Sequence, residues 1–351
     1  MSDGIYKIAS FNMFKFSLQS NENIRKNLNE IANIIQRSKF DIVGMQEVLS
    51  EDAIQQLIGT LNHRGNMQWS YVWVTPRTRR RYGLLGESLE DKSEQRAEGF
   101  AYIWNTLRIE RVSTKLYDSE DGKVCGTRIA EPHVFTQYKV NKAKHQQELH
   151  RDPYYIRLKP KGLFFEIRLI NTHIRFGKQK DDNLGAVALR KNEFDVLTES
   201  ILPRINDKRY GNHMPSLTIL MGDYNLNLER AYTKSPYLCE EKKVGKHIYI
   251  TVQDQLTTLK NKEDENDDTE LRGFANNYDH FSYDKERMMH FQSGQAKRIK
   301  AVGNEGHYYG TDFERYRKEV SDHLPIVLTV DFKGRFHKAP EDDVDEQEYF
   351  E

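Results

Sequence analysis

Carboxylate, amide and imidazole side chains recur in this chain directly after short apolar segments. The clearest example spans residues 217–225, where an apolar run and a glycine are followed by Asp223 and, two positions later, Asn225. An apolar run of this length that is bounded by glycine predicts a buried strand. Because alternate residues of a strand point to the same side, both polar groups leave the strand end together. On its own, the pattern also fits an Asx turn that closes an ordinary loop.

Similar polar residues follow other predicted strands. They are Asn12, Glu47, His173, Asp279, Asp322 and His323. Oxygen ligands of this kind suit a hard cation such as Mg²⁺ or Mn²⁺, which takes one or two carboxylates and keeps positions for water and phosphate oxygen. Histidines beside carboxylates suit proton transfer or stabilisation of charge on a phosphate. The set therefore predicts metal-assisted hydrolysis of a phosphodiester or a phosphomonoester.

Hydrophobic periodicity indicates the elements that would position these groups. It predicts strands at residues 5–13, 42–45, 69–74, 99–104, 154–158, 163–170, 217–221, 247–252, 278–283 and 324–330. Apolar residues at helical spacing predict three helices, which run from about Ser20 or Asn21 to near Phe40, through residues 54–61, and from about 184 to 205. Two long polar connections, 75–97 and 118–150, separate some of these strands, and His280 is expected to be a loop histidine.

Composition excludes several classes of protein. The chain has 351 residues, of which 37% are hydrophobic, and its mean hydropathy is −0.80, so it is a polar globular chain long enough for a large core. It has no apolar stretch that could span a membrane and no signal-peptide pattern, so we expect a cytoplasmic protein without a membrane partner. Cys125 and Cys239 cannot form a disulfide framework and do not have metal-ligand spacing.

Charge is balanced overall but unevenly distributed. There are 53 basic and 53 acidic residues, so the net charge neither favours nor excludes a polyanionic partner. Arg79, Arg80 and Arg81 lie together in the loop after residue 75, which fits either a solvated surface or contacts to the phosphate backbone of DNA. Acidic residues are concentrated at the C-terminus, where residues 336–351 are expected to form a disordered tail.

The ordered set of motifs resembles the endonuclease/exonuclease/phosphatase superfamily, which has the deoxyribonuclease I-like fold. The motifs are Ser10-Phe11-Asn12, Gln46-Glu47, Asn171-Thr172-His173, Gly222-Asp223-Tyr224-Asn225, Tyr278-Asp279 and Ser321-Asp322-His323-Leu324-Pro325. Each motif is weak alone, but six in this order are specific. The resemblance implies an α/β fold of the α+β kind: a four-layer α/β/β/α sandwich of two mixed, mainly antiparallel sheets flanked by helices. It implies one catalytic domain over residues 1–335.

The resemblance also implies roles for the residues on the metal side of the site. Glu47 would be the principal ligand of Mg²⁺ or Mn²⁺, and Asn12 and Asp322 would complete the site. Asp223 would orient or deprotonate the attacking water. Asn225 would donate a hydrogen bond to the scissile phosphate.

Two histidines are implied on the phosphate side. His323 would contact a phosphate oxygen, with its orientation fixed by Asp279. His173 would stabilise charge or protonate the leaving oxygen, and its expected carboxylate partner is Glu98. Arg151 resembles the arginine with which deoxyribonuclease-like members clamp a phosphate, a role suited to its bidentate guanidinium.

The resemblance is nearer to the deoxyribonuclease branch than to the inositol phosphatases. The latter have Trp-Cys-Asp-Arg where this chain has Asn277-Tyr278-Asp279-His280, which disfavours an inositol phosphatase. Glu98 before Gly99 and Arg151 before a proline are features shared with the deoxyribonuclease branch, and this resemblance favours a metal-dependent DNA endonuclease that nicks the backbone. Leu49 departs from the deoxyribonuclease pattern, in which arginine is common. Alternatives are a nuclease acting on RNA, a phosphatase or phosphodiesterase acting on a small molecule or lipid, and a non-catalytic binding module.

Overall fold

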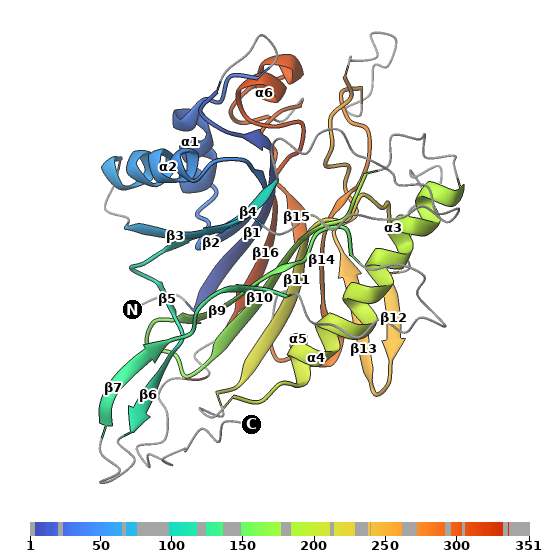
Figure 1. Ribbon diagram of the computed structural model, residues 1–351. Coiled ribbons are helices and arrows are strands. Elements are labelled where there is room, and N and C mark those ends of the chain that lie inside the picture. The colour runs from blue at the N-terminus through green and yellow to red at the C-terminus, as the bar shows by residue number, and fades with distance from the viewer. Residues whose placement is uncertain are drawn as a thin grey trace.

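Two β-sheets packed face to face, with helices on both outer faces, form the body of the protein (Figure 1). The computed structural model describes residues 4–19, 24–64, 68–75, 98–117, 124–135, 149–176, 184–210, 214–228, 238, 240–261, 272–291, 296–303, 306–332 and 336. This arrangement confirms the four-layer α/β sandwich expected from the sequence.

The first sheet has six strands in the order β15-β16-β1-β2-β4-β3. Its strands are β1 (Ile5–Phe16), β2 (Ile42–Val48), β3 (Trp69–Val74), β4 (Gly99–Asn105), β15 (Ala296–Arg298) and β16 (Ile326–Asp331). β1 and β2 run parallel, and the other neighbours are antiparallel. The parallel pair places the C-terminal ends of β1 and β2 side by side.

The second sheet has eight strands, in the order β12-β13-β14-β11-β10-β9-β5 with β8 paired to β9. Its strands are β5 (Ile109–Arg111), β8 (His133–Val134), β9 (Tyr154–Pro160), β10 (Glu166–His173), β11 (Ser216–Asp223), β12 (Glu241–Val244), β13 (His247–Val252) and β14 (Asp279–Asp284). Here β10 and β11 are the parallel pair. A separate hairpin consists of β6 (Ser113–Tyr117) and β7 (Val124–Ile129).

Helices cover each outer face, as expected for sheets with a second apolar side. The first sheet is covered by α1 (Leu28–Arg37), α2 (Glu51–His63) and α6 (Phe313–Glu319). The second is covered by α3 (Leu184–Val196), the π-helical segment η1 (Leu197–Ile201) and α4 (Leu202–Asp207), while the short helix α5 (Lys285–Met288) follows β14. None of the helices in the described ranges is both long and apolar enough to cross a membrane.

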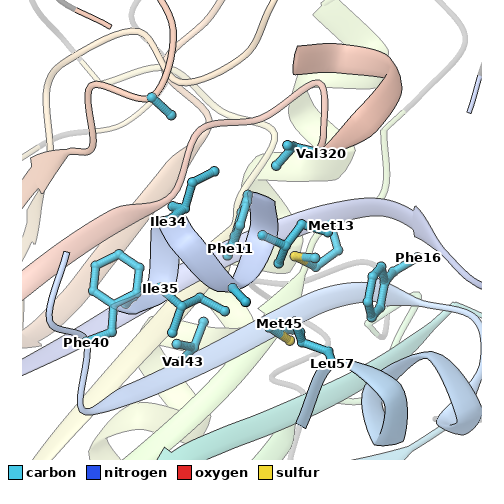
Figure 2. Close-up of a cluster of buried hydrophobic side chains, with 14 of the residues drawn as sticks. Phe11, Met13, Phe16, Ile34, Ile35, Phe40, Val43, Met45, Leu57 and Val320 are labelled. Carbon is cyan, nitrogen blue, oxygen red and sulfur yellow. The ribbon is translucent and has the colours of Figure 1, made fainter. Parts of the chain in front are cut away.

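Three buried clusters of apolar side chains correspond to the three interfaces between layers. Along β1, Phe11 and Met13 face α1 and α2, whereas Tyr6 and Ile8 face the other sheet. Figure 2 shows the first cluster, in which Phe11 and Met13 meet side chains from the covering helices. This alternation follows from the two-residue period of a strand, and it fixes which polar residues at the strand ends can meet.

The structure differs from the sequence-based expectation at several elements. Helix α1 begins at Leu28, later than Ser20 or Asn21, because the side chain of Asn27 accepts from the Glu30 N–H and caps the helix. Strands β7 and β8 lie within the predicted polar connection 118–150. They were not predicted because their few apolar residues show no strand periodicity. The expectation for His280 is wrong: it is fully buried on β14.

Candidate active site

At one edge of the second sheet, β10 and β11 end and the antiparallel strand β14 begins at the same level, with a histidine and two carboxylates. His173 on β10 is paired in register with Asp223 on β11, and Asp223 is paired with Asp279 on β14. All three side chains are buried. Just before Asp223, Gly222 has a φ of +145°, and a Cβ there would lie 1.9 Å from the Thr172 carbonyl oxygen. Only glycine therefore permits this approach of β11 to β10.

The first sheet contributes an amide and a carboxylate from the ends of β1 and β2. Register is irregular in both strands at this point, and Glu47 has a φ of +56°. Asn12 donates from Nδ2 to Glu47 Oε1 at 3.1 Å and to Asp223 Oδ2 at 3.0 Å. The side chains of the two sheets thus form one continuous network.

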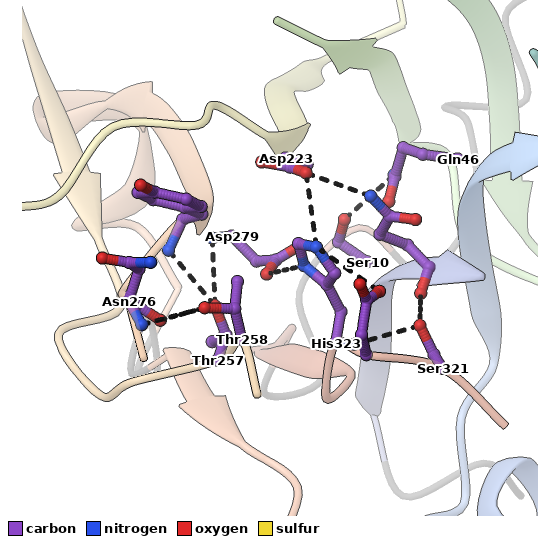
Figure 3. Close-up of polar contacts among 12 residues, drawn as sticks. Ser10, Gln46, Asp223, Thr257, Thr258, Asn276, Asp279, Ser321 and His323 are labelled. Carbon is purple, nitrogen blue, oxygen red and sulfur yellow. Dashed lines mark hydrogen bonds and ion pairs between the residues drawn. The ribbon is translucent and has the colours of Figure 1, made fainter. Parts of the chain in front are cut away.

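Buried polar residues join the two sheets just below this network. Gln46 donates to Ser10 Oγ at 3.1 Å and to Asn171 Oδ1 at 2.6 Å, so it bridges β1, β2 and β10. Ser321 donates to the Asn12 carbonyl at 2.7 Å and accepts from the His323 N–H at 3.0 Å. The sequence motifs contained Ser10, Gln46, Asn171 and Ser321, but sequence reasoning assigned them no role. Figure 3 shows this layer with His323 between Asp279 and Asp223.

Asp223 lies between two imidazoles. Its Oδ2 atom is 3.6 Å from Nε2 of His173 and 3.6 Å from Nε2 of His323. The other ring nitrogen of His323 lies 2.7 Å from Asp279 Oδ2, and that of His173 lies 3.4 Å from Glu98 Oε2. Each histidine therefore has one nitrogen toward a supporting carboxylate and the other toward Asp223.

Burial and charge shift the pKa values in this cluster. Burial raises the pKa of Asp223 to about 6, although His323 and His173 act to lower it. Burial alone would lower the pKa of His323, but Asp279 and Asp223 raise it well above its ordinary value. The pKa of His173 is also raised, because Glu98 and Asp223 outweigh burial and Arg151. Protonated imidazoles are therefore favoured on both sides of Asp223.

Arg151 supports Glu98. Its guanidinium pairs with the Glu98 carboxylate and lies 3.4 Å from the His173 carbonyl oxygen. Burial would raise the pKa of Glu98, but His173 and Arg151 lower it to about 2. Arg151 thus pairs with the carboxylate that lies beside His173. The family resemblance instead implies that Arg151 clamps a phosphate. That role stays a prediction, as do the catalytic and metal-binding roles of the other residues.

The donor set around Glu47 fits a hard cation. Its two carboxylate oxygens each accept one hydrogen bond, from Asn12 Nδ2 and from the Lys15 N–H. Asp322 Oδ1 is buried and has no hydrogen-bond partner, which a cation or its water would satisfy. Asn12 Oδ1 accepts from the Phe14 N–H, so the amide of Asn12 turns its nitrogen toward Glu47. No group of three or more His, Cys, Asp or Glu residues in the described part of the chain could enclose an ion, but Mg²⁺ sites often have only one or two carboxylates.

The remaining predicted residues lie in different places. Asn225, with a φ of +50°, donates from Nδ2 to the Ile174 carbonyl at 2.7 Å, and its N–H donates to Asp223 Oδ1 at 2.8 Å. It therefore fixes the turn that holds Asp223. Arg79, Arg80 and Arg81 lie outside the described residues.

Comparison with known proteins agrees with this architecture. No family model matches the chain. A deoxyribonuclease from Thioalkalivibrio sp. (strain K90mix) is 23% identical over 329 residues, which are 93% of this chain and 72% of the relative. The TDP2 protein of Caenorhabditis elegans has a TM-score of 0.50 at 13% identity, with 93% of this chain and 75% of that chain covered.

The chain shares the fold of TDP2, in which two packed sheets are flanked by helices. The resemblance drawn from the sequence motifs is confirmed at the level of this fold. An endonuclease/exonuclease/phosphatase family protein from Bacteroides thetaiotaomicron has 15% identity and a TM-score of 0.49, covering 93% of this chain and 97% of the other. In the present chain, both parallel strand pairs end at the network around Asp223.

Proposed function

We propose that this protein is a divalent-metal-dependent phosphodiesterase, and that it acts as an endonuclease that nicks DNA. The observation that carries the proposal is the position of Asp223, which lies between two histidines and is joined through Asn12 to Glu47. A carboxylate, two imidazoles and a hard-cation donor set can together activate water, stabilise charge on a phosphodiester and protonate the leaving oxygen. The similarity to a deoxyribonuclease over most of both chains supports a phosphoric ester hydrolase.

Asp223 is proposed to orient the attacking water and to accept its proton. It is 1% exposed, and burial raises its pKa to about 6, which makes it a better base than an ordinary aspartate. The Asn225 N–H and Asn12 Nδ2 hold its two oxygens from opposite sides. The carboxylate is therefore fixed before substrate binds.

His323 and His173 are proposed to bind the oxygens of the phosphate and the leaving group. As cations, both would stabilise the negative charge that accumulates on the phosphate during attack, and His173 would protonate the leaving oxygen. Asp279 lies 2.7 Å from Nδ1 of His323 and Glu98 lies 3.4 Å from Nδ1 of His173, so Nε2 of each ring is directed toward Asp223.

Glu47, with Asp322, is proposed to hold Mg²⁺ or Mn²⁺. When bound there, such a cation would supply Lewis-acid stabilisation of the charge on the phosphate. The chain itself supplies a carboxylate fixed by two hydrogen bonds and, on Asp322, a buried oxygen without a hydrogen-bond partner.

The proposal is tested by incubating wild type with a panel of substrates in Mg²⁺ or EDTA. The panel contains supercoiled plasmid, single-stranded DNA, RNA, bis(p-nitrophenyl) phosphate and p-nitrophenyl phosphate. We expect nicked plasmid and cleaved diester only with Mg²⁺, and loss of both in Asp223→Ala. RNA cleavage without DNA cleavage, or release of phosphate from the monoester alone, would overturn the choice of substrate. Equal activity of wild type and Asp223→Ala would overturn the site.

A further inference from the structure

Three cationic side chains converge on one aromatic ring beside the proposed metal site. The ring of Phe14 lies 5.4 Å from Lys15 Nζ, 5.5 Å from Lys26 Nζ and 5.9 Å from the Arg317 guanidinium carbon. We call Phe14, Lys15, Lys26 and Arg317 the Phe14 cluster. Its members come from β1, from the segment before α1 and from α6, so the fold brings them together from distant parts of the sequence.

The backbone of the Phe14 cluster is held by the same side chains that form the metal side of the site. The Phe14 N–H donates to Asn12 Oδ1 at 3.0 Å, and the Lys15 N–H donates to Glu47 Oε2 at 3.1 Å. Phe14 and Lys15 have φ values of +43° and +54°, a conformation that costs energy in residues other than glycine. Such local strain is retained where the surrounding contacts require one particular placement.

Two cations of the cluster are anchored by carbonyl groups. Lys26 Nζ donates to the Val320 carbonyl at 2.6 Å, and Arg317 Nη1 donates to the Lys260 carbonyl at 3.0 Å. Arg317 also lies 3.8 Å from Asp322 Oδ2, and Lys15 is exposed. Carbonyl oxygens stabilise these cations in place but do not cancel their charge.

The balance of charge next to the cluster favours an anionic ligand. Glu47 and Asp322, which contact Lys15 and Arg317, supply two negative charges beside the cluster. Against them stand Lys15, Arg317 and Lys26, and although burial lowers the pKa of Lys26 to about 8, its charged form is still favoured at pH 7. One aromatic ring has two faces, so it cannot stabilise three cations equally. A divalent cation held by the two carboxylates would leave a larger positive excess. A phosphate group close to the cluster offsets this excess.

We propose that the Phe14 cluster binds a phosphodiester group adjacent to the scissile one, so that the substrate is a nucleic-acid strand with several phosphates. This inference rests on the proposed function, because it places a second phosphate beside the first. Lys15, the exposed member, contacts the backbone, and the Phe14 ring supports the neighbouring sugar or base by stacking.

Binding of a strand is measured without turnover, in the Asp223→Ala background with EDTA. The ligand is a fluorescein-labelled 15-nucleotide single-stranded DNA, and anisotropy gives the Kd from 25 to 200 mM KCl. Addition of Lys15→Ala removes one phosphate contact, so the slope of log Kd against log salt should fall by about 0.7. The matched control is Lys243→Ala, on an exposed position of β12 far along the second sheet, which should leave the slope at the background value.

Equal slopes for the Lys15→Ala and Lys243→Ala variants would overturn the inference. A second variant, Phe14→Leu, keeps an apolar side chain and every charge, so it should weaken binding several-fold while the slope is retained; unchanged binding would contradict the role of the ring. Cleavage by wild type is measured separately. If wild type hydrolyses no phosphate ester, the proposed function fails, whereas the slope difference still decides on the Phe14 cluster.

Discussion

Asn12 Nδ2 donates to Asp223 Oδ2 at 3.0 Å, across 211 positions of sequence and from one sheet to the other. The same nitrogen donates to Glu47 Oε1 at 3.1 Å. One amide group therefore joins the proposed base on β11 to the proposed metal ligand on β2. Because this one amide binds both carboxylates, it fixes the position of each relative to the other.

Replacement of Asn12 by alanine should remove the link between the proposed base Asp223 and the proposed metal ligand Glu47. We expect kcat to fall by roughly 10²-fold, because Asp223 and Glu47 lose a shared donor that fixes their geometry. The Mg²⁺ concentration that gives half-maximal rate should rise as well. Steady-state kinetics over a series of Mg²⁺ concentrations measures both effects, and an Asn12→Ala enzyme with wild-type kcat would show that the bridge has no catalytic role.

Asp279 should control the protonation of His323. Its carboxylate, 2.7 Å from Nδ1, helps to raise the pKa of His323 well above the ordinary value. With Asp279→Asn this pKa falls, so His323 loses its proton at lower pH and the alkaline limb of kcat/KM moves to lower pH. The matched control is Asp284→Asn, because Asp284 is buried on the same strand and lies 2.6 Å from His247. A limb that moves equally in both variants would contradict this role.

Glu98 should stabilise the fold only above acidic pH. Its pKa falls from 4.5 to about 2 in the folded protein, so its charged form contributes stability above pH 4.5 that is lost as pH decreases toward 2. We expect Glu98→Gln to lower the free energy of unfolding by on the order of 2 kcal/mol at pH 7, and by progressively less below pH 4.5. Urea unfolding over a pH series measures this difference.

An exposed ion pair provides the comparison for Glu98. Glu110 lies 3.0 Å from Lys159 at the surface, so Glu110→Gln should cost less than about 1 kcal/mol. A Glu98→Gln variant that differs from wild type equally at pH 7 and pH 3 would contradict the assignment of the lowered pKa to the folded state.

Gly222 should tolerate no side chain. Its φ of +145° and the 1.9 Å approach of a Cβ to the Thr172 oxygen require the backbone to shift, so Gly222→Ala should lose more than about 2 kcal/mol of stability. Gly59→Ala is the control. Gly59 is exposed on α2, and a Cβ there would have no atom within 4 Å, so this change should increase the free energy of unfolding by at most about 1 kcal/mol. Thermal unfolding of both variants would contradict the account if their midpoints were equal.

Much of the fold could be predicted from the sequence because its core strands are continuous apolar runs. Residues 217–221 predict β11, and the polar residues after it mark the edge at which Asp223 lies. The short strands β5, β6, β12 and β15 could not be predicted, since three to five residues with few apolar side chains have no clear period. Their pairing depends on neighbours that are distant in sequence.

The candidate site was predictable to the extent that its residues follow strands. The contact between Arg151 and Glu98 could not be inferred, because it depends on how a segment outside the strands packs against the start of β4. Lys26 and Arg317 lie in no motif, and only the folded chain brings them to Phe14. His280 was predicted to lie in a loop because histidine is polar. Its ring can be buried because its nitrogens lie within hydrogen-bond distance of the backbone carbonyls of Gln253, Leu226 and Asn277.

The central claim is that Asp223 and His323 act on one phosphate. It is tested most directly by single-turnover cleavage of a labelled DNA strand, measured for wild type, Asp223→Ala, His323→Ala and the double variant. Groups that act as a unit have non-additive effects on rate. We expect each single variant to be slower by roughly 10³-fold and the double variant to be slower than either by less than about tenfold. Cleavage by the single variants at the wild-type rate, or losses that multiply in the double variant, would contradict the account.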